Sequence, residues 1–172
     1  MKIHAVRGNI LDIEADTLVL PVDGSAPGLE GSVARQFMKR VGVEEMYELY
    51  APPPHYPFNG SCYWSSSVPP GKVHFKHICV LGMLSHEQGV NHEGYIASAF
   101  GAMFQHAGCD PDYGEVIASP VLRGGTRMNY VDAVYLMLKV YHENYHRHSS
   151  VTLLVVENDE DRFEMLTSII EP

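Results

Sequence analysis

Residues 24–32 read Gly24-Ser25-Ala26-Pro27-Gly28-Leu29-Glu30-Gly31-Ser32, a glycine-rich loop directly after the apolar run Thr17-Leu18-Val19-Leu20-Pro21-Val22. A second glycine loop, Arg123-Gly124-Gly125-Thr126, follows Glu115-Val116-Ile117-Ala118-Ser119-Pro120-Val121. Glycine lets backbone N–H groups face a ligand because it has no Cβ. A helix that begins just after such a loop adds unpaired N–H donors and a partial positive charge. If both loops lie at one end of a sheet, we expect them to form a cradle for a diphosphate.

Apolar runs alternate with amphipathic segments along the chain. The pattern predicts strands at residues 2–7, 17–22, 73–83, 116–121 and 151–156. It predicts a helix from residue 31, with Ser32 as its N-cap, and further helices at 43–50, 93–106, 130–145 and 160–170. Residues 51–71, rich in proline, glycine and serine, are expected to be irregular. This alternation indicates one α/β layered domain over residues 1–172 with a largely parallel sheet.

Composition narrows the class of protein and of partner. The chain has 172 residues, 45% hydrophobic, and a formal net charge of −9. Such a balance argues against general nucleic-acid binding, which needs clustered lysine and arginine. Cys62, Cys79 and Cys109 lack metal-ligand spacing and indicate thiols of a reducing compartment. With no signal peptide or membrane span in view, we expect a cytoplasmic protein without membrane contact. The oligomeric state stays open.

One short motif suggests a different chemistry. Residues 142–146 read His142-Glu143-Asn144-Tyr145-His146, and histidines four apart on a helix can ligate zinc with the glutamate as general base. The motif falls at the end of the predicted helix 130–145, in a chain with 10 histidines. We therefore keep a zinc-dependent hydrolase as an alternative and predict neither a bound metal nor a cofactor.

From Gly8 to Gly42 the chain resembles the opening of a macro domain. Gly8-Asn9-Ile10 corresponds to the G-D-I turn of that family, and Leu18–Asp23 to its strand ending in N-A-A-N. Gly31-Ser32-Val33-Ala34-Arg35 corresponds to its glycine loop running into a helix. Later, Ser119–Gly125 resembles F-P-x-I-S-T-G, and Val155–Glu160 resembles the segment before the last helix.

The resemblance implies a three-layer α/β/α sandwich with a mixed, largely parallel sheet. It also implies a cleft at the strand ends that binds ADP-ribose or a related nucleotide diphosphate, free or attached to a protein. The ligand-binding residues that it implies, together with the two loops, are Asn9, Ile10, Gly28, Gly31, Ser32, Val33, Arg123, Gly124, Gly125, Thr126 and Arg127.

Departures from the family pattern bear on selectivity and catalysis. Asn9 stands where the family has the aspartate that bonds the adenine amine, and is equally explained as a turn residue. Asp23 stands where the family has the asparagine that contacts the distal ribose. Asp23 is the candidate catalytic residue, which would polarise a water for ADP-ribosyl hydrolysis. The alternative is that Asp23 forms a hydrogen-bonded turn at the end of the strand. We favour a binding module over a hydrolase, with a ligand-free interaction module as a further alternative.

Overall fold

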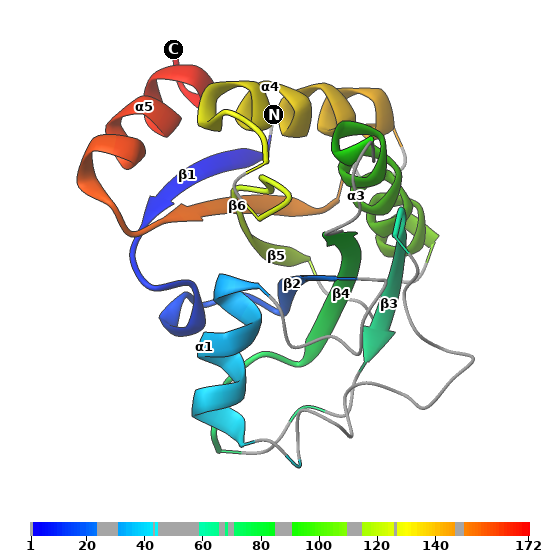
Figure 1. Cartoon of the computed structure of the whole chain (residues 1–172), viewed down its shortest axis with the longest axis vertical. Coiled ribbons are helices and arrows are strands. Elements are labelled where there is room, and N and C mark those ends of the chain that lie inside the picture. The colour runs from blue at the N-terminus through cyan, green and yellow to red at the C-terminus, as the bar shows by residue number, and fades with distance from the viewer. Residues whose placement is uncertain are drawn as a thin grey trace.

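A mixed sheet forms the centre of the computed structural model (Figure 1). The model describes residues 2–23, 31–42, 44, 59–65, 68, 71–84, 91–109, 115–125, 127–146 and 150–172, and these contain six strands in the order β1-β6-β5-β2-β4-β3. All neighbouring pairs are parallel except β3 with β4. The strands are β1 (Ile3–Arg7), β2 (Thr17–Asp23), β3 (Ser61–Ser65), β4 (His77–Leu84), β5 (Val116–Pro120) and β6 (Thr152–Glu157).

Helices cover both faces of this sheet. One face packs against α3 (His92–Cys109), α4 (Tyr130–Asn144) and α5 (Glu160–Ile170). The other face packs against α1 (Ser32–Val41) and the short 3-10 helix η1 (Ile10–Asp12), as the arrangement in Figure 1 shows. In the described part of the chain, no helix has the length and apolar character needed to cross a bilayer.

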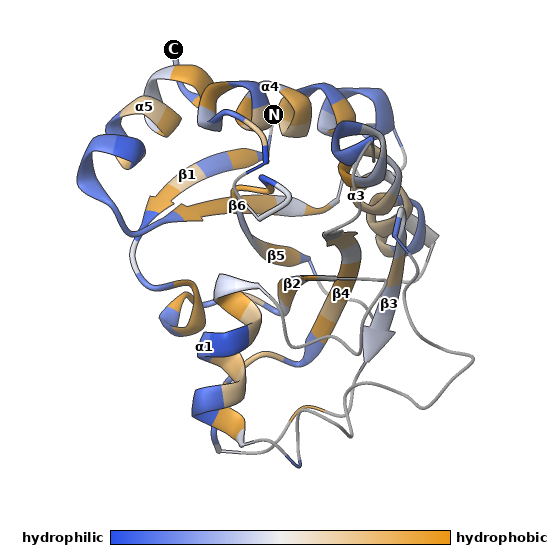
Figure 2. Cartoon of the chain, viewed as in Figure 1, coloured by the Kyte–Doolittle hydropathy of each residue, from blue (hydrophilic) through white to orange (hydrophobic). Residues whose placement is uncertain are grey.

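The central strands are apolar on both sides because both faces of the sheet are covered. In β2, Leu18 and Leu20 pack with the α1 layer, whereas Val19 between them packs with the layer of α3, α4 and α5. Figure 2 shows hydrophobic residues along the central strands and hydrophilic ones on outward turns of the helices. The continuous apolar run of residues 17–22 thus reflects a strand buried on both faces.

The predicted three-layer α/β/α fold with a mixed, largely parallel sheet is confirmed. One element was missed, since β3 (Ser61–Ser65) lies inside the stretch 51–71 that was predicted to be irregular. The strand predicted at 73–83 begins later, at His77. The helix predicted at 43–50 falls almost wholly outside the described residues.

At the amino edge of the sheet, Asp16 ties three strands together. Its carboxylate oxygen Oδ2 accepts hydrogen bonds from the backbone N–H groups of Glu115 and Val116, at 3.0 and 3.1 Å. Its other oxygen accepts one from Lys76 Nζ at 2.6 Å. The hydrogen bond from Lys76 and those from the two backbone groups lower the pKa of Asp16, although burial acts the other way. The starts of β2, β4 and β5 are therefore linked through one side chain.

Candidate ligand-binding site

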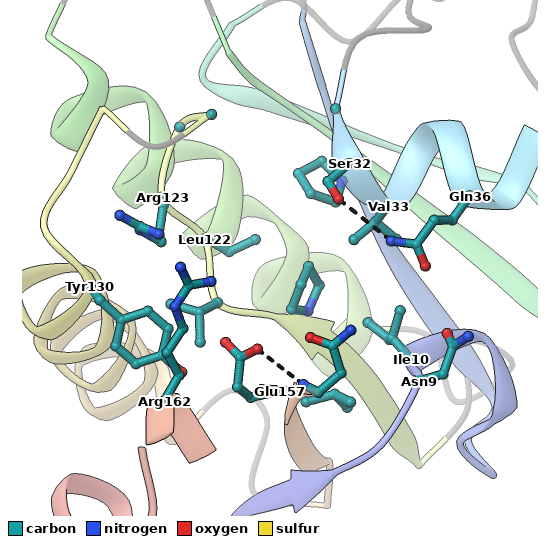
Figure 3. Close-up of a pocket in the computed structure, with 18 of the residues that line it drawn as sticks. Asn9, Ile10, Ser32, Val33, Gln36, Leu122, Arg123, Tyr130, Glu157 and Arg162 are labelled. Atoms are coloured by element: carbon teal, nitrogen blue, oxygen red, sulfur yellow. Dashed lines mark hydrogen bonds between the residues drawn. The ribbon is translucent and has the colours of Figure 1, made fainter. Parts of the chain in front are cut away.

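A cavity of about 320 Å³ lies at the opposite, carboxyl edge of the sheet. Because β1, β6, β5 and β2 run parallel, the segments that follow them emerge at this same edge. The cavity is lined by the turn after β1, the loop after β5, the end of β6 with the start of α5, and the first turn of α1 (Figure 3). Open α/β folds bind ligands beyond the carboxyl ends of their strands, and this volume is at the lower end of the range for small-molecule sites.

One side of the cavity is the N-terminal turn of α1. Gly31 is the N-cap and supplies no side chain to cap the helix, whereas Ser32, expected as the cap, is the first helical residue. Within the helix, the backbone hydrogen bonds begin at the N–H of Arg35, which donates to the Gly31 carbonyl at 2.9 Å. The N–H groups of Ser32 and Val33 therefore have no partner inside the helix, and both residues line the cavity. This turn offers N–H donors and the positive end of the helix dipole.

The loop after β5 brings a second glycine-rich stretch of backbone to the cavity. Gly124 and Gly125 have φ angles of +59° and +65°, so two successive residues adopt the left-handed conformation that favours glycine. The turn is closed by the Met128 N–H donating to the Arg123 carbonyl at 3.1 Å, and Arg123 Nε donates back to the Met128 carbonyl at 3.2 Å. We call Gly31, Ser32 and Val33, together with Gly124 and Gly125, the amide wall.

A different wall of the cavity consists of large side chains. Tyr130, the first residue of α4, is 8% exposed, and its buried hydroxyl has no hydrogen-bond partner among the described residues. The guanidinium carbons of Arg123 and Arg162 lie 5.8 and 5.9 Å from the centre of the Tyr130 ring (Figure 3). Burial raises the pKa of Tyr130, and the nearby Glu157 carboxylate raises it further through its charge and by attracting the hydroxyl proton, whereas Arg123 and Arg162 act the other way. The hydroxyl is therefore neutral at physiological pH. We call Arg123, Tyr130 and Arg162 the basic wall.

Glu157 ends β6 and brings a carboxylate to the same cavity. Its Oε1 atom accepts hydrogen bonds from the backbone N–H groups of Asn158 and Asp159, at 3.0 and 3.1 Å. These bonds fix one oxygen of the carboxylate at the start of α5. Within the described residues, neither Arg123 nor Arg162 forms an ion pair with this or any other carboxylate. Both guanidinium groups are thus available to a ligand.

The turn after β1 lines the cavity through Asn9 and Ile10. The Asn9 side-chain oxygen accepts a hydrogen bond from the Leu11 N–H at 3.1 Å and so caps the helix η1. The turn-forming role considered for Asn9 is therefore present in the structure. Its amide nitrogen still provides donors for a ligand.

The structure brings most of the predicted binding residues together around one cavity. Asn9, Ile10, Gly31, Ser32, Val33, Arg123, Gly124 and Gly125 all line it. Arg127 does not, and instead lines a separate depression with Glu93, Asp132 and Lys139. Gly28 and Thr126 lie outside the described residues. Asp23 ends β2, where its backbone pairs with Leu84, and its side chain lies outside what the structure describes.

The zinc motif straddles the end of a helix. His142 and Glu143 belong to the last turn of α4, which ends at Asn144, so His146 lies beyond the helix. Throughout the described ranges, no group of three His, Cys, Asp or Glu side chains is placed to hold a metal ion. The helical face that the zinc alternative requires is therefore incomplete.

Sequence reasoning missed Tyr130, Glu157 and Arg162 as lining residues. A usable signal was present, because Glu157 directly follows the predicted strand 151–156 and Arg162 lies in the first turn of the predicted helix 160–170. Residues at the carboxyl end of a parallel strand gather at the ligand edge of the sheet. That rule was applied to the strands 17–22 and 116–121, but not to 151–156.

Comparison with solved structures identifies the fold. The chain superposes on a Trypanosoma brucei macrodomain in complex with ADP-ribose with a TM-score of 0.75 and 13% identity, over 98% of this chain and 69% of that one. A point mutant of an Oceanobacillus iheyensis macrodomain, determined with ADPR, superposes with a TM-score of 0.72 and 16% identity, over 99% of this chain and 94% of that one. The macrodomain of Mycobacterium tuberculosis DarG superposes with a TM-score of 0.69 and 16% identity, over 91% of this chain and 98% of that one.

These similarities cover nearly the whole chain and show that it has the macrodomain fold. No protein-family profile matches the sequence, and no curated protein matches it either. The predicted resemblance to macro domains is therefore confirmed in the structure, at identities that make this chain a divergent example of the fold.

Proposed function

We propose that the cavity binds a nucleoside diphosphate, with ADP-ribose as the first ligand to test. The observation that carries this proposal is the convergence of two segments far apart in the sequence, 31–33 and 123–125, on one cavity. Each brings backbone donors, one from a helix N-terminus and the other from a turn with two left-handed glycines. Diphosphates are bound by such donors in other α/β proteins.

The charge of the cavity agrees with an anionic ligand even though the whole chain is acidic. Its described lining contains the cations Arg123 and Arg162 and one anionic residue, Glu157. The formal net charge of the chain is −9. A local excess of positive charge inside an acidic protein favours a small anion over an extended polyanion, whose other phosphates would meet the acidic surface.

Two of the solved macrodomains that superpose on this chain were determined with ADP-ribose bound. This supports ADP-ribose as the first ligand to test, and apolar residues of the cavity such as Ile10 and Val33 suit the flat face of a base.

A thermal-shift and calorimetry series tests the proposal. ADP-ribose at 100 times its dissociation constant stabilises a protein by about 2.7 kcal/mol, which for this length raises the melting temperature by roughly 5 to 10 °C. ADP, NAD and ribose 5-phosphate form the comparison panel. The absence of a shift with every compound would favour the alternative of an interaction module without a ligand.

The variant Ser32→Glu separates ligand binding from stability. A carboxylate in the first turn of α1 favours the helix by about 0.3–1 kcal/mol, yet it repels a bound diphosphate. We therefore expect a melting temperature at or slightly above wild type, together with at least a roughly tenfold rise in the dissociation constant for ADP-ribose. Ser150→Glu adds the same charge beside the start of β6 and should leave affinity unchanged. Unchanged affinity in Ser32→Glu would contradict the proposed diphosphate position.

Hydrolysis of an ADP-ribosyl bond is a separate part of the proposal, and it centres on Asp23. Incubation with an ADP-ribosylated peptide tests it directly. Turnover that disappears in Asp23→Ala would assign a hydrolase, whereas tight binding without turnover would assign a binding module.

A further inference from the structure

The basic wall provides positive charge in addition to the amide wall that the proposed diphosphate site uses. In Figure 3, Arg123, Tyr130 and Arg162 lie on one side of the cavity, and Ser32, Val33 and Gln36 lie on the other. The basic wall therefore lies across the cavity from the α1 part of the amide wall, and it adjoins the other part because Arg123 directly precedes Gly124.

The chemistry of the basic wall suits a phosphate monoester. Both guanidinium groups lie within 6 Å of the Tyr130 ring and lack a carboxylate partner among the described residues. Two cations beside one ring repel each other, and an anion bound between them removes this repulsion. Guanidinium groups bind phosphate oxygens through paired N–H donors. The Tyr130 hydroxyl is a neutral donor beside them; it forms no hydrogen bond of normal geometry among the described residues, although the Glu157 carboxylate lies near enough to raise its pKa.

The neighbouring strand ends indicate which part of a nucleotide would reach this wall. The Gly8 N–H donates to the Glu157 carbonyl at 3.1 Å, which brings the turn after β1 beside the end of β6. For a base at Asn9 and Ile10, the position that the macro-domain resemblance implies, the end of β6 is the adjoining part of the cavity and is within reach of the attached ribose. In dinucleotide-binding folds, an arginine near the ribose accommodates a 2′-phosphate, whereas an acidic residue bonds the free hydroxyl. Here two arginines accompany one carboxylate, which already accepts two backbone hydrogen bonds.

We propose that Arg123 and Arg162 form a second phosphate subsite, and that the preferred ligand is a nucleoside diphosphate sugar bearing a phosphate on the ribose next to its base. This inference rests on the proposed diphosphate site. It adds a specificity that the amide wall alone does not provide.

Calorimetry with three ligands tests the subsite on the whole chain. We compare ADP-ribose, ADP-ribose 2′-phosphate and ADP-ribose 1″-phosphate at low and moderate salt. The 2′-phosphate should bind at least about tenfold more tightly than ADP-ribose, and this advantage should shrink as salt increases. Equal or weaker binding of the 2′-phosphate, with ADP-ribose still bound, overturns the subsite while leaving the proposed function intact. If none of the three ligands binds, the proposed function fails as well.

The position of the phosphate is tested by the third ligand. A preference for the 1″-phosphate over the 2′-phosphate would contradict the assignment to the ribose next to the base, because that phosphate lies on the far sugar.

Variants of the two arginines link the preference to the wall. Arg162→Gln leaves the backbone cap of α5 intact, since Asp159 bonds the Arg162 N–H and not its guanidinium. We expect Arg162→Gln to weaken binding of the 2′-phosphate at least about tenfold and binding of ADP-ribose less, so that the ratio of the two dissociation constants falls toward one. Arg123→Lys keeps a positive charge at the other residue of the subsite and should retain part of the preference for the 2′-phosphate.

Lys139→Gln is the matched control, because it removes one positive charge from the exposed side of α4, away from the cavity. It should leave the preference at its wild-type value. A purely structural role of Arg162 would lower the melting temperature without changing the ratio of the two dissociation constants. A wild-type ratio in Arg162→Gln would therefore overturn the proposal.

Discussion

The two edges of the sheet differ in whether their polar groups have hydrogen-bond partners inside the protein. At the amino edge, the carboxylate of Asp16 accepts hydrogen bonds from Glu115, Val116 and Lys76, so the strand starts are joined within the protein. At the carboxyl edge, the first N–H groups of α1 have no partner inside the helix, and the Tyr130 hydroxyl has none among the described residues. The same parallel strands thus begin in a closed hydrogen-bond network and end at an open cavity.

In this fold, we expect the amino edge of the sheet mainly to determine stability and the carboxyl edge mainly to determine ligand affinity. Hydrogen bonds completed inside the protein stabilise it, whereas donors left open at a cavity reduce stability unless a ligand accepts their bonds. Substitutions at the amino edge should therefore change the free energy of unfolding with little effect on affinity. Side-chain substitutions at the carboxyl edge should do the reverse, whereas a substitution at a left-handed glycine of that edge also costs stability.

The largest expected effect on stability is that of Asp16→Asn. An asparagine has one acceptor oxygen where the carboxylate has two, so it cannot accept both the backbone hydrogen bonds and the bond from Lys76. We therefore expect a loss of about 2–3 kcal/mol in the free energy of unfolding, measured by urea denaturation at pH 7. The pKa of Asp16 is lowered in the folded protein, so its contribution is present above the ordinary value of 3.8. It is lost as the pH falls through the lower folded value, so the difference between variant and wild type should shrink in acid.

Asp12→Asn is the matched control for this prediction. Asp12 also pairs with a cation, Arg40 at 2.6 Å, but its side chain is 62% exposed. An exposed pair contributes less than about 1 kcal/mol. Equal losses in the two variants would mean that Asp16 acts as an ordinary surface ion pair.

An intermediate effect is expected for Gly124→Ala. Its φ of +59° disfavours any residue with a Cβ, and the added atom would lie an ordinary 3.5 Å from His92 Nδ1. We therefore expect a loss of about 1–2 kcal/mol from backbone strain alone, and weaker binding of ADP-ribose if the turn relaxes away from its left-handed form.

Gly71→Ala introduces the same kind of strain, with φ of +77°, where the added Cβ meets nothing within 4 Å. It should lose similar stability in a melting experiment and keep its affinity for ADP-ribose. If both variants bind as wild type does, the loop at 124 and 125 is not part of the binding site.

The smallest expected effect is that of Tyr130→Phe. Because the buried hydroxyl lacks a partner among the described residues, its removal should leave the unfolding free energy unchanged or raise it by up to about 1 kcal/mol. The raised pKa means that Tyr130 contributes stability below its ordinary value of 10.0, which is lost as the pH rises toward the folded value. Urea denaturation at neutral pH and at a pH just above that ordinary value should show a shallower alkaline loss in the variant. A clear loss of stability at neutral pH would reveal a hydrogen bond at this hydroxyl.

The sequence predicted the fold well because its strands are strongly apolar. Runs such as 17–22 and 116–121 are buried on both faces, and this pattern has few alternative explanations. The strand β3 was missed because Ser61-Cys62-Tyr63-Trp64-Ser65 is an edge strand with polar ends, set among prolines and serines. An edge strand pairs on one side, so its sequence carries a weaker pattern.

The amide wall could also be predicted, because glycine and a helix start leave a local signature. Of the basic wall, Arg123 was predicted from its place in the second glycine loop. Tyr130 and Arg162 were not, because their meeting with Arg123 depends on the strand order β6-β5 and on the placement of α4 and α5. Arg127 follows the same loop in sequence, yet it lines a separate depression, so its predicted contact with the ligand stays a prediction.

The pairing of β1 with β6 has a consequence for how the protein is made. Ile3 lies opposite Leu153, so the first strand acquires its hydrogen-bond partner only after most of the polypeptide has left the ribosome. Asn9 and Glu157 line the same cavity, so the cavity is complete only after β6 has paired with β1. Such distant pairing slows folding, and a nascent chain that stops short of β6 would hold both glycine segments without a complete site between them.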